Sequence, residues 1–459
     1  MPKKSDIVEG KIEKVLFPNV GVMHLEENIP VYVKGAYKNQ LVSARLLKKK
    51  KGIWQAQLID ELENPSYFIA SDCTHFKQCG GCAMRHIPYD MQLNLKHSQV
   101  IDLIKEAQVS DFEDLGIVSS PNLLDYRNKM EFSFGDAYKG GPMTLGMHRK
   151  NTTFDVLTVE GCMIASQDFS LLLRCVLDYC IENQLPYYKK LSHEGYMRYL
   201  VIRQSKTTGD ILVNIVTSTQ MQHDFSALVQ RMQNLALEGN IKGVLHTYTD
   251  TLADAIKPDT IKLIFGEDFI TEKILGLTFK ISPFSFFQTN TLGADMLYKK
   301  ALDLIEEIDN KTVFDLYCGT GTITQIMATK AKKVYGIEIV EEAVVKAREN
   351  AALNGLSNCT FITGDVLTEV DKLTDKPDII VLDPPREGIH PKAIQKIIDF
   401  KAKELVYISC KPTSLVRDLP IFEEAGYKVK KLMCVDMFPH TVHVETVVLM
   451  CASSEAGKC

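Results

Sequence analysis

One cysteine, Cys410, stands where a thiol could take part in a reaction. It follows the apolar run 404–409, which predicts a buried strand, and Pro412 stops that strand from continuing. Ligands of open α/β sheets bind at the carboxyl ends of the strands, so the pattern places the thiol at the mouth of a cleft. Nearby acid–base candidates are Glu445, at the start of the apolar run 445–451, and His440 and His443 just before it.

Other residues with binding chemistry follow the strands of the same region. From residue 312, strands alternate with helices, which predicts a parallel sheet. Run 313–322 is a strand leading into a glycine turn, and Glu338 ends the next strand, where an acid accepts hydrogen bonds from ribose hydroxyls. The turn lacks the third glycine of a dinucleotide site and is closer to the nucleoside-binding turn of S-adenosylmethionine (SAM) methyltransferases. Four successive strand ends therefore predict a cofactor cleft, with Tyr317 and Gly319, Glu338, Asp365 and Asp383.

A thiol beside a methyl donor favours one reaction. Methyl transfer to oxygen or nitrogen needs no thiol, whereas C5 of a pyrimidine is a poor nucleophile that thiolate addition at C6 activates. After the transfer, a base must remove the C5 proton before the thiol is eliminated. Glu445, His440 and His443 all compete for that role, and their spacing does not decide among them.

A second group of cysteines has the spacing of a metal centre. Cys73, Cys79 and Cys82 form the pattern C-x5-C-G-G-C, whose glycines let the backbone fold tightly, and Cys162 is the best candidate for a fourth ligand. Three clustered cysteines and a remote one favour an iron–sulfur cluster. Zinc also accepts four thiolates and stays open as an alternative. Two further cysteines in the apolar run 169–185 are expected in the core.

The first 62 residues predict a small β module. Five short apolar runs, 11–17, 21–25, 29–33, 41–47 and 54–58, suit a five-stranded OB-like barrel, a fold that commonly binds oligonucleotides. The lysine run 48–51 falls in the predicted hairpin loop between the last two strands, where it can face phosphates. The segment resembles the TRAM domain of several RNA-modifying enzymes.

The middle of the chain predicts a basic surface. A long helix over 86–108 precedes strand 126–134, which carries Arg127 and Lys129. Strand 196–204 carries Arg198 and Arg203, and run 210–216 is its expected hairpin partner. Together the four cations predict a basic face across one antiparallel sheet that binds an RNA backbone.

Length and composition limit the number of domains and the classes of function that are possible. The 459 residues predict an α/β protein of three domains: a TRAM or OB-like barrel at 1–62, a central α+β iron–sulfur domain at 63–275 and a methyltransferase domain at 276–459. We expect the helix near 88–108 to pack on the third domain. A net charge of -5 confines nucleic-acid binding to local patches. No apolar run reaches the length of a membrane span, so we expect a cytoplasmic monomer whose cysteines are thiols or metal ligands.

The motifs together resemble the RNA (uracil-5-)-methyltransferase family over essentially the whole chain. The resemblance rests on Ser409-Cys410-Lys411-Pro412, the run 436–445, the turn 315–321 and the four cysteines, and it is greatest to the 23S ribosomal RNA branch. It implies a Rossmann-like class I methyltransferase domain, SAM as cofactor and 23S rRNA as partner. It further implies Cys410 as the nucleophile and Glu445 as the base.

The same resemblance assigns the remaining site residues. Phe286 matches an aromatic that stacks on the target base, and Thr322 stands where some members carry Asn. The residues that match cofactor contacts are Gln288, Tyr317, Gly319, Gly321, Thr322, Glu338, Asp365 and Asp383. The residues that match the ligands of a [4Fe-4S] cluster are Cys73, Cys79, Cys82 and Cys162.

Other targets and functions are weighed against this one. The same chemistry on the T-loop uridine of tRNA is the first alternative, and the N-terminal module and cysteine cluster favour rRNA over it. A 5-methylcytosine enzyme commonly carries Cys after Asp-x-Pro, and an adenine N6 enzyme an aromatic after the two prolines, whereas this chain has Arg386. A non-enzymatic iron–sulfur RNA-binding module leaves Cys410 and Glu445 without a purpose. A thiol inside a cleft implies that the uracil leaves its stack, which favours unpaired loops of structured RNA.

Overall fold

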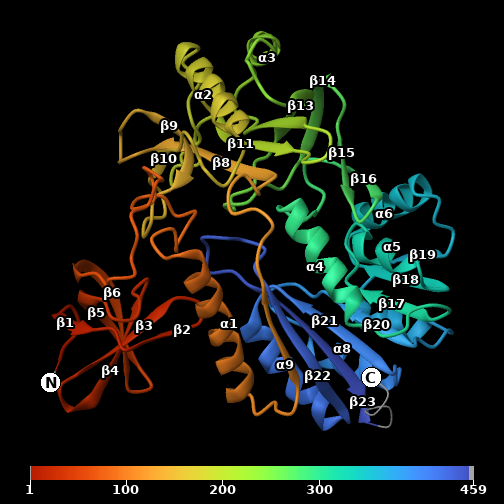
Figure 1. Cartoon of the computed structure of the whole chain (residues 1–459). Coiled ribbons are helices and arrows are strands. Elements are labelled where there is room, and N and C mark those ends of the chain that lie inside the picture. Colours follow the sequence, from red (N-terminus) through yellow and green to blue (C-terminus); the bar gives the residue numbers. More distant parts are fainter. Residues whose placement is uncertain (1, 454–459) are drawn as a thin grey trace.

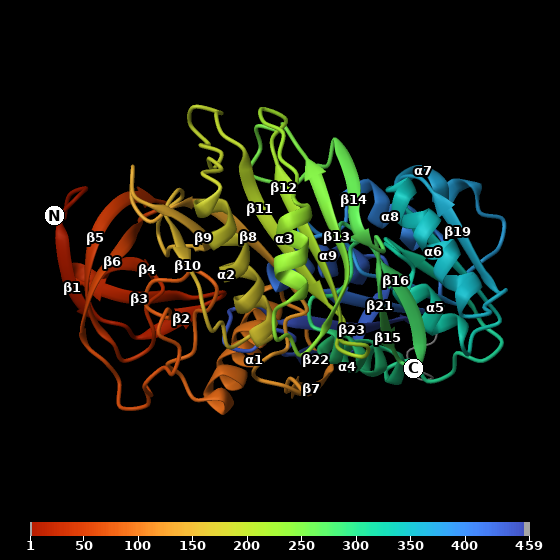
Figure 2. The same ribbon diagram turned by 90° about the horizontal axis from the view of Figure 1, so that it is seen from above.

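The computed structural model describes residues 2–453 of the chain. Residue 1 and residues 454–459, the outer ends of the predicted first and third domains, lie outside the described residues. Within the described part, the strands form four sheets, of six, seven, two and eight strands. Figures 1 and 2 show an N-terminal sheet (residues 7–63), a central sheet (129–266) and a C-terminal sheet (mainly 312–452). None of the helices within residues 2–453 combines the length and apolar character that a membrane crossing requires.

The N-terminal sheet packs around a small apolar core that includes Ile12, Met23 and Trp54. Of the strand predicted over 11–17, only residues 14–16 form a strand of their own, and residue 11 ends the strand before it, so the sheet has six strands where five were predicted. The lysine run also differs from the prediction: residues 48–50 continue the strand, since they pair with 53–55, and only residues 51 and 52 form the turn. In sheet order, the strands are β1 (Ile7–Lys11), β5 (Leu41–Lys50), β6 (Ile53–Glu63), β4 (Ile29–Lys34), β3 (Val20–Leu25) and β2 (Lys14–Leu16).

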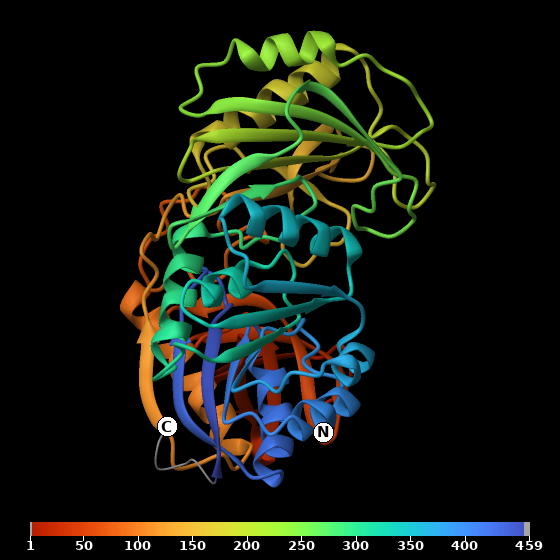
Figure 3. The same ribbon diagram turned by 90° about the vertical axis from the view of Figure 1, so that its right-hand side faces the viewer.

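The central sheet has one face covered by helices α2 (Gln167–Glu182) and α3 (Ser226–Gln233), as Figure 3 shows. Cys175 and Cys180 of α2 are buried there, as predicted, and the predicted pairing of strands 196–204 and 210–216 is confirmed. In sheet order, the strands are β10 (Val156–Thr158), β9 (Met143–His148), β8 (Lys129–Asp136), β11 (Met197–Gln204), β12 (Asp210–Thr217), β13 (Asn240–Tyr248) and β14 (Thr260–Gly266).

The hairpin of β15 (Ile270–Ile274) and β16 (Leu277–Ile281) leads from the central sheet to the C-terminal sheet. In sheet order, the strands of the C-terminal sheet are β19 (Cys359–Thr363), β18 (Lys333–Glu338), β17 (Thr312–Leu316), β20 (Ile379–Leu382), β21 (Glu404–Ser409), β23 (Glu445–Ala452), β22 (Tyr427–Val435) and β7 (Glu113–Val118). The first five strands are mutually parallel, as the alternation of strands and helices predicts. After β17 the chain builds outward through β18 and β19, then returns to add β20 on the other side. That reversal is the point where ligands of α/β sheets bind.

Helices cover both faces of the C-terminal sheet. Since successive residues of a strand point to opposite faces, neighbouring residues pack against different helix layers. Val313 faces the layer that contains α4, whereas Phe314 faces the layer that contains α8 and α9. Helix α1, from the chain before the central sheet, packs Val100 and Ile104 into this second layer. The helices are α1 (Tyr89–Glu106), α4 (Thr291–Asp303), α5 (Thr322–Ala328), α6 (Glu341–Leu353), α7 (Val366–Glu369), α8 (Pro391–Asp399) and α9 (Pro412–Glu424).

Candidate active site

Cys410 and Glu445 lie at the adjoining ends of two neighbouring strands. β21 and β23 are antiparallel, with Ser409 opposite Thr446. Cys410 directly follows β21 and Glu445 begins β23, and the Glu445 carboxylate raises the pKa of the Cys410 thiol, so the two groups are neighbours. Cys410 is half-buried, and Glu445 is 4% exposed. A thiol and a carboxyl group thus share one sheltered edge of the sheet.

The pKa values around this edge show that four ionisable groups interact. Burial first, and then the carboxylates of Glu445 and Asp383, raise the pKa of the Cys410 thiol to about 11, and Arg386 opposes them. Burial also raises the pKa of Glu445 to about 7, again against Arg386. For Asp383, removal from water and then Glu445 hold the pKa well above its usual range. An acid with a pKa near neutrality is suited to accept a proton during a reaction.

The glycine turn after β17 has a backbone that few residues adopt. Gly319 and Gly321 have positive φ angles of 53° and 75°, and a Cβ on Gly321 would lie 2.7 Å from the ring of Phe361. Tyr317 is not a glycine, yet its φ is 80°, which marks strain of the kind found at ligand sites. Thr322 is nearly buried at the first position of α5.

Glu338 and Asp365 lie at the strand ends beside this turn. Glu338 accepts a hydrogen bond from the backbone N–H of Gly319 at 3.0 Å, which ties the end of β18 to the turn. Asp365 caps α7 by accepting from Leu367 N at 2.9 Å. Burial and then the Asp365 carboxylate raise the pKa of Tyr317 to about 12, so these two residues are neighbours.

Segment 282–290, which carries Phe286 and Gln288, is held from two sides. Arg203 of the central sheet donates to Ser285 O at 2.8 Å, and Thr320 of the glycine turn donates to Phe286 O at 3.1 Å. The Phe286 side chain nevertheless remains 66% exposed. An exposed aromatic ring on an anchored backbone beside the cleft is suited to stack on a flat ligand.

Neither histidine that competed with Glu445 is free. Gln92 donates to His440 Nδ1 at 3.2 Å, and Arg386 lies 3.2 Å from His443 Nδ1. Burial lowers the pKa of both rings to about 4, so both are neutral at physiological pH. Of the three candidates, Glu445 is the one that belongs to β23, the strand paired with β21.

The loop before Glu445 is fixed by the chain around the cysteine cluster. Ala83 N and Met84 N both donate to His440 O, at 2.8 and 2.9 Å. Lys96 of α1 forms a fully buried ion pair with Asp436 at 2.7 Å. The segment that follows Cys82 and the loop that leads to Glu445 are thus one hydrogen-bonded unit.

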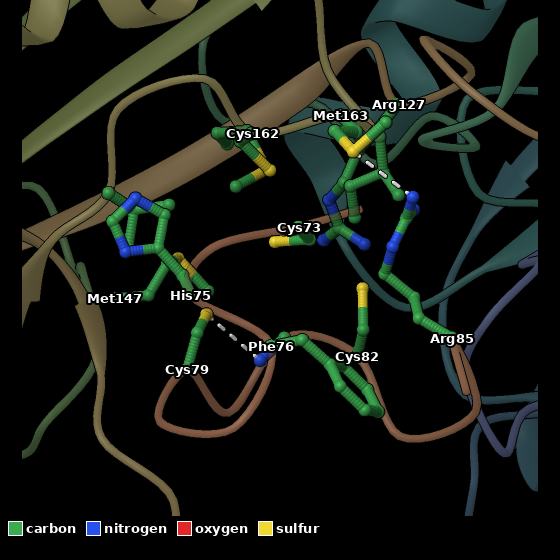
Figure 4. A pocket seen from close by; sticks show the side chains of 14 residues that line it. Cys73, His75, Phe76, Cys79, Cys82, Arg85, Arg127, Met147, Cys162 and Met163 are labelled. Atoms are coloured by element: carbon green, nitrogen blue, oxygen red, sulfur yellow. Dashed lines mark hydrogen bonds between the residues drawn. The ribbon is translucent and has the colours of Figure 1, made fainter. Parts of the chain in front are cut away.

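The four predicted metal ligands line one cavity of about 210 Å³. Figure 4 shows the side chains of Cys73, Cys79, Cys82 and Cys162 around this cavity, with Arg85 and Arg127 at its edge. Burial raises the pKa of Cys82 to about 12 and also raises that of Cys79 and Cys162. Among residues 2–453, no three His, Cys, Asp or Glu side chains form a group that could hold a metal ion as they stand. Four sulfur donors around a cavity fit a cluster of several metal atoms.

The predicted basic face is wrong in its exposure. Arg203 and Arg198 are 3% and 5% exposed, and both donate to backbone carbonyls. Lys129 forms an ion pair with Glu131 at 2.6 Å, and Arg127 lines the cysteine cavity. Residues 249 and 251 cover Arg198, and Ser285 covers Arg203; a register shift between Met197 and Tyr199 also breaks the alternation at Arg198.

Two further buried residues of the site, Asp315 and Asn128, are not among the predicted site residues. Asp315 is fully buried within β17, where burial raises its pKa to about 7 and Thr324 donates to it at 2.6 Å. Asn128 donates to Gln288 O and to Thr291 Oγ1, and so joins the central sheet to α4. The available signal for Asp315 is a lone acid inside an apolar strand.

Comparisons with known proteins agree with this geometry. The sequence profile of the family described as tRNA (uracil-5-)-methyltransferase matches residues 88–453. An uncharacterized RNA methyltransferase of Clostridium tetani is 46% identical, with 97% of this chain and 98% of that protein aligned. A similar protein of Clostridium acetobutylicum is 47% identical over 98% of both chains. The Pyrococcus abyssi tRNA (uracil-54, C5)-methyltransferase, solved with S-adenosyl-L-homocysteine, shares the fold, with a TM-score of 0.77, 23% identity and coverage of 96% of this chain and 100% of its own.

Proposed function

The chain belongs to the tRNA (uracil-5-)-methyltransferase family, a family of SAM-dependent RNA methyltransferases, and from this premise we propose that it methylates C5 of uridine in 23S ribosomal RNA. The observation that carries the proposal is the position of Cys410 beside Glu445. A thiol and a carboxyl group with a pKa near 7 are the two groups that this reaction needs.

In the proposed reaction, the Cys410 thiolate bonds to C6 of the uracil, and the ring electrons move toward C5. SAM supplies the electrophilic methyl group that C5 takes up. Glu445 then accepts the C5 proton, the C5–C6 double bond re-forms, and the bond from Cys410 to C6 breaks. Arg386, which lowers the pKa of the thiol, stabilises Cys410 as a thiolate before addition and after release.

The residues around the glycine turn are proposed to hold the cofactor. The Glu338 carboxylate at the end of β18 would accept the ribose hydroxyls, and Asp365 at the end of β19 would meet the adenine amine. The backbone at Gly319 and Gly321 leaves room for the nucleoside. Gln288, Tyr317, Thr322 and Asp383 complete the proposed set of contacts.

Cys73, Cys79, Cys82 and Cys162 are proposed to hold a [4Fe-4S] cluster. When bound, the cluster would cross-link residues 73–82 to residue 162 through four thiolates. The support is the shared cavity and the four sulfur donors around it. Because Ala83 and Met84 bond to His440, the cross-link would also steady the loop that leads to Glu445.

The proposed RNA contacts begin at Phe286, whose exposed ring would stack on the uracil after it leaves its helix. Exposed lysines 48–50 on β5 give the N-terminal sheet a positive strand that can follow phosphates, as expected of a TRAM domain. This additional RNA-binding module and the cysteine cluster are the features that favour rRNA over the T-loop of tRNA.

Transfer of a labelled methyl group from SAM to unmodified 23S rRNA and tRNA transcripts tests the proposal. We expect 5-methyluridine in the 23S transcript and none in tRNA, and no product with Cys410→Ala. Label in tRNA alone would overturn the rRNA assignment and keep the chemistry. Label at a base other than uracil would overturn the chemistry.

A further inference from the structure

A second cavity, of about 200 Å³, opens on the central sheet, away from the cysteines and from Cys410. Its lining combines aromatic rings with two cations and one acid. An apolar cavity of about 150 Å³ is large enough to bind benzene, so this one has room for a flat ring. The lining residues that matter here are Phe154, Tyr188, Lys190, Arg198, Tyr199 and Asp254.

Arg198 is the fixed element of this cavity. Its Nη1 and Nη2 donate to Thr249 O and Thr251 O, both at 2.8 Å, and its guanidinium lies 4.2 Å from the centre of the Tyr188 ring. The side chain is 5% exposed, and its Nε has no hydrogen-bond partner among residues 2–453. The bonds to Thr249 and Thr251 hold the guanidinium in place as one wall of the cavity.

The mouth of the cavity is both charged and apolar. Lys190 and Tyr199 each bond to Asp254 at 2.7 Å, which holds the three side chains in place. Phe154 and Leu252 at the rim are 49% and 71% exposed. Exposed apolar side chains beside a lysine match a ligand with a flat ring and a negative charge.

The cavity lies on the same face of the sheet as the contact to Phe286. Side chains alternate along β11, so Tyr199 and Arg203 point away from α2, and Arg203 bonds to Ser285 next to Phe286. Four residues of strand separate them, about 13 Å at the usual rise. A single RNA strand with its uracil at Phe286 can reach this cavity with its neighbouring nucleotides.

We propose that this cavity binds one unpaired base of the RNA substrate, a few nucleotides from the uridine that is methylated. The base stacks against Phe154 beside the wall formed by Arg198 and Tyr188, and Lys190 contacts the adjoining phosphate. This inference rests on the proposed function, because it assumes that the substrate is RNA. It adds to the proposed function a site that recognises the sequence or shape of the RNA around the uridine that is methylated.

Phe154→Ala and Lys190→Gln test the proposal in the full-length protein, with Tyr138→Ala as the matched control, because Tyr138 is an exposed aromatic outside the cavity. The probe is a 23S rRNA fragment that contains the target uridine, with photoreactive 4-thiouridine in its unpaired segments. At constant salt, we expect each cavity variant to bind this RNA about tenfold more weakly, the loss of one stacked base or of its phosphate contact. The control should bind as the wild type does, and cross-links should map to 153–154, 188–199 or 252–254.

Wild-type RNA affinity in both cavity variants would overturn the proposal, and so would cross-links that miss all three segments. Unchanged SAM binding by each variant shows that the fold is intact. Neither binding nor cross-linking requires methyl transfer. If the RNA binds and cross-links at the cavity but is never methylated, the proposed function fails and the cavity assignment stands. If the RNA is methylated and both cavity variants bind it as the wild type does, the cavity assignment alone fails.

Discussion

Glu445→Gln should stabilise the protein, and only at high pH. Burial raises the pKa of Glu445 from its ordinary value of 4.5 to about 7, so the folded protein holds this proton more tightly than the unfolded chain does. Ionised Glu445 therefore opposes folding: its contribution to stability is largest below pH 4.5 and is lost as the pH rises to 7. Since a tenfold change in proton affinity is worth about 1.4 kcal/mol, the full cost is about 3 kcal/mol above pH 7. A neutral glutamine avoids that cost.

Urea unfolding of the wild type and of Glu445→Gln at about pH 5 and about pH 8.5 measures this cost as a difference in free energy of unfolding. We expect the variant to be about 3 kcal/mol more stable at the higher pH and nearly equal at the lower pH. Glu424→Gln is the matched control, because Glu424 is exposed, and exposed substitutions usually change stability by less than about 0.5 kcal/mol. An equal difference at both pH values, or no gain at pH 8.5, would refute the account of Glu445 as a buried acid tuned toward neutrality.

Three further substitutions test the site and its support. Cys410→Ala should lower methyl transfer from labelled SAM at least about a thousandfold while filter binding of RNA persists, since only the bond to C6 is lost. Arg386→Gln should slow alkylation of Cys410 by iodoacetamide roughly fivefold near pH 8, because loss of the cation leaves less thiolate. Lys96→Met should lower the free energy of unfolding by about 3–5 kcal/mol, because Asp436 stays buried without its partner, whereas the exposed Lys105→Met on the same helix should change it little.

Each of these results has a clear opposite. Residual activity of Cys410→Ala near the wild-type rate would remove the nucleophile assignment. Alkylation of Cys410 that is unchanged in Arg386→Gln would show that the arginine does not act on the thiol. Equal stability of the Lys96 and Lys105 variants would mean that the ion pair between α1 and the loop before Glu445 contributes nothing.

The strand ends of the C-terminal sheet were predictable because parallel strands carry a strong local signal. Apolar runs that end in Gly319, Glu338, Asp383 and Cys410 must bring those residues to one edge, whatever the loops do. The placement of Glu445 near Cys410 was not predictable in the same way. It depends on β23 inserting antiparallel beside β21 in one register, and that register is set by packing on both faces of the sheet.

The segment between α1 and the central sheet shows where local patterns fail. Strand β7, Glu113–Val118, has three exposed residues followed by three half-buried ones, so it lacks the alternation of a half-buried strand. It pairs with β22 at the edge of the C-terminal sheet, although β22 lies some three hundred residues later in the sequence. The side chains of β7 do not indicate this backbone pairing. Pairing of this kind carries no local signal.

The buried arginines of the central sheet illustrate a second limit. Alternation correctly gives the face on which Arg203 lies, but an exposed face and a covered face have the same alternation. Whether Arg203 meets solvent or Ser285 O is decided by the loop that packs over it. Arg198 is likewise covered, by residues 249 and 251.

The most direct test of the central claim is mass spectrometry of Glu445→Gln after reaction with SAM and 23S rRNA. Without the base, the C5 proton stays in place and the bond from Cys410 to C6 persists. We predict a peptide containing Cys410 whose mass is increased by a methylated uridine nucleotide, in a complex that survives denaturant. Complete turnover with no nucleotide on Cys410, or a nucleotide attached to another residue, would contradict the account.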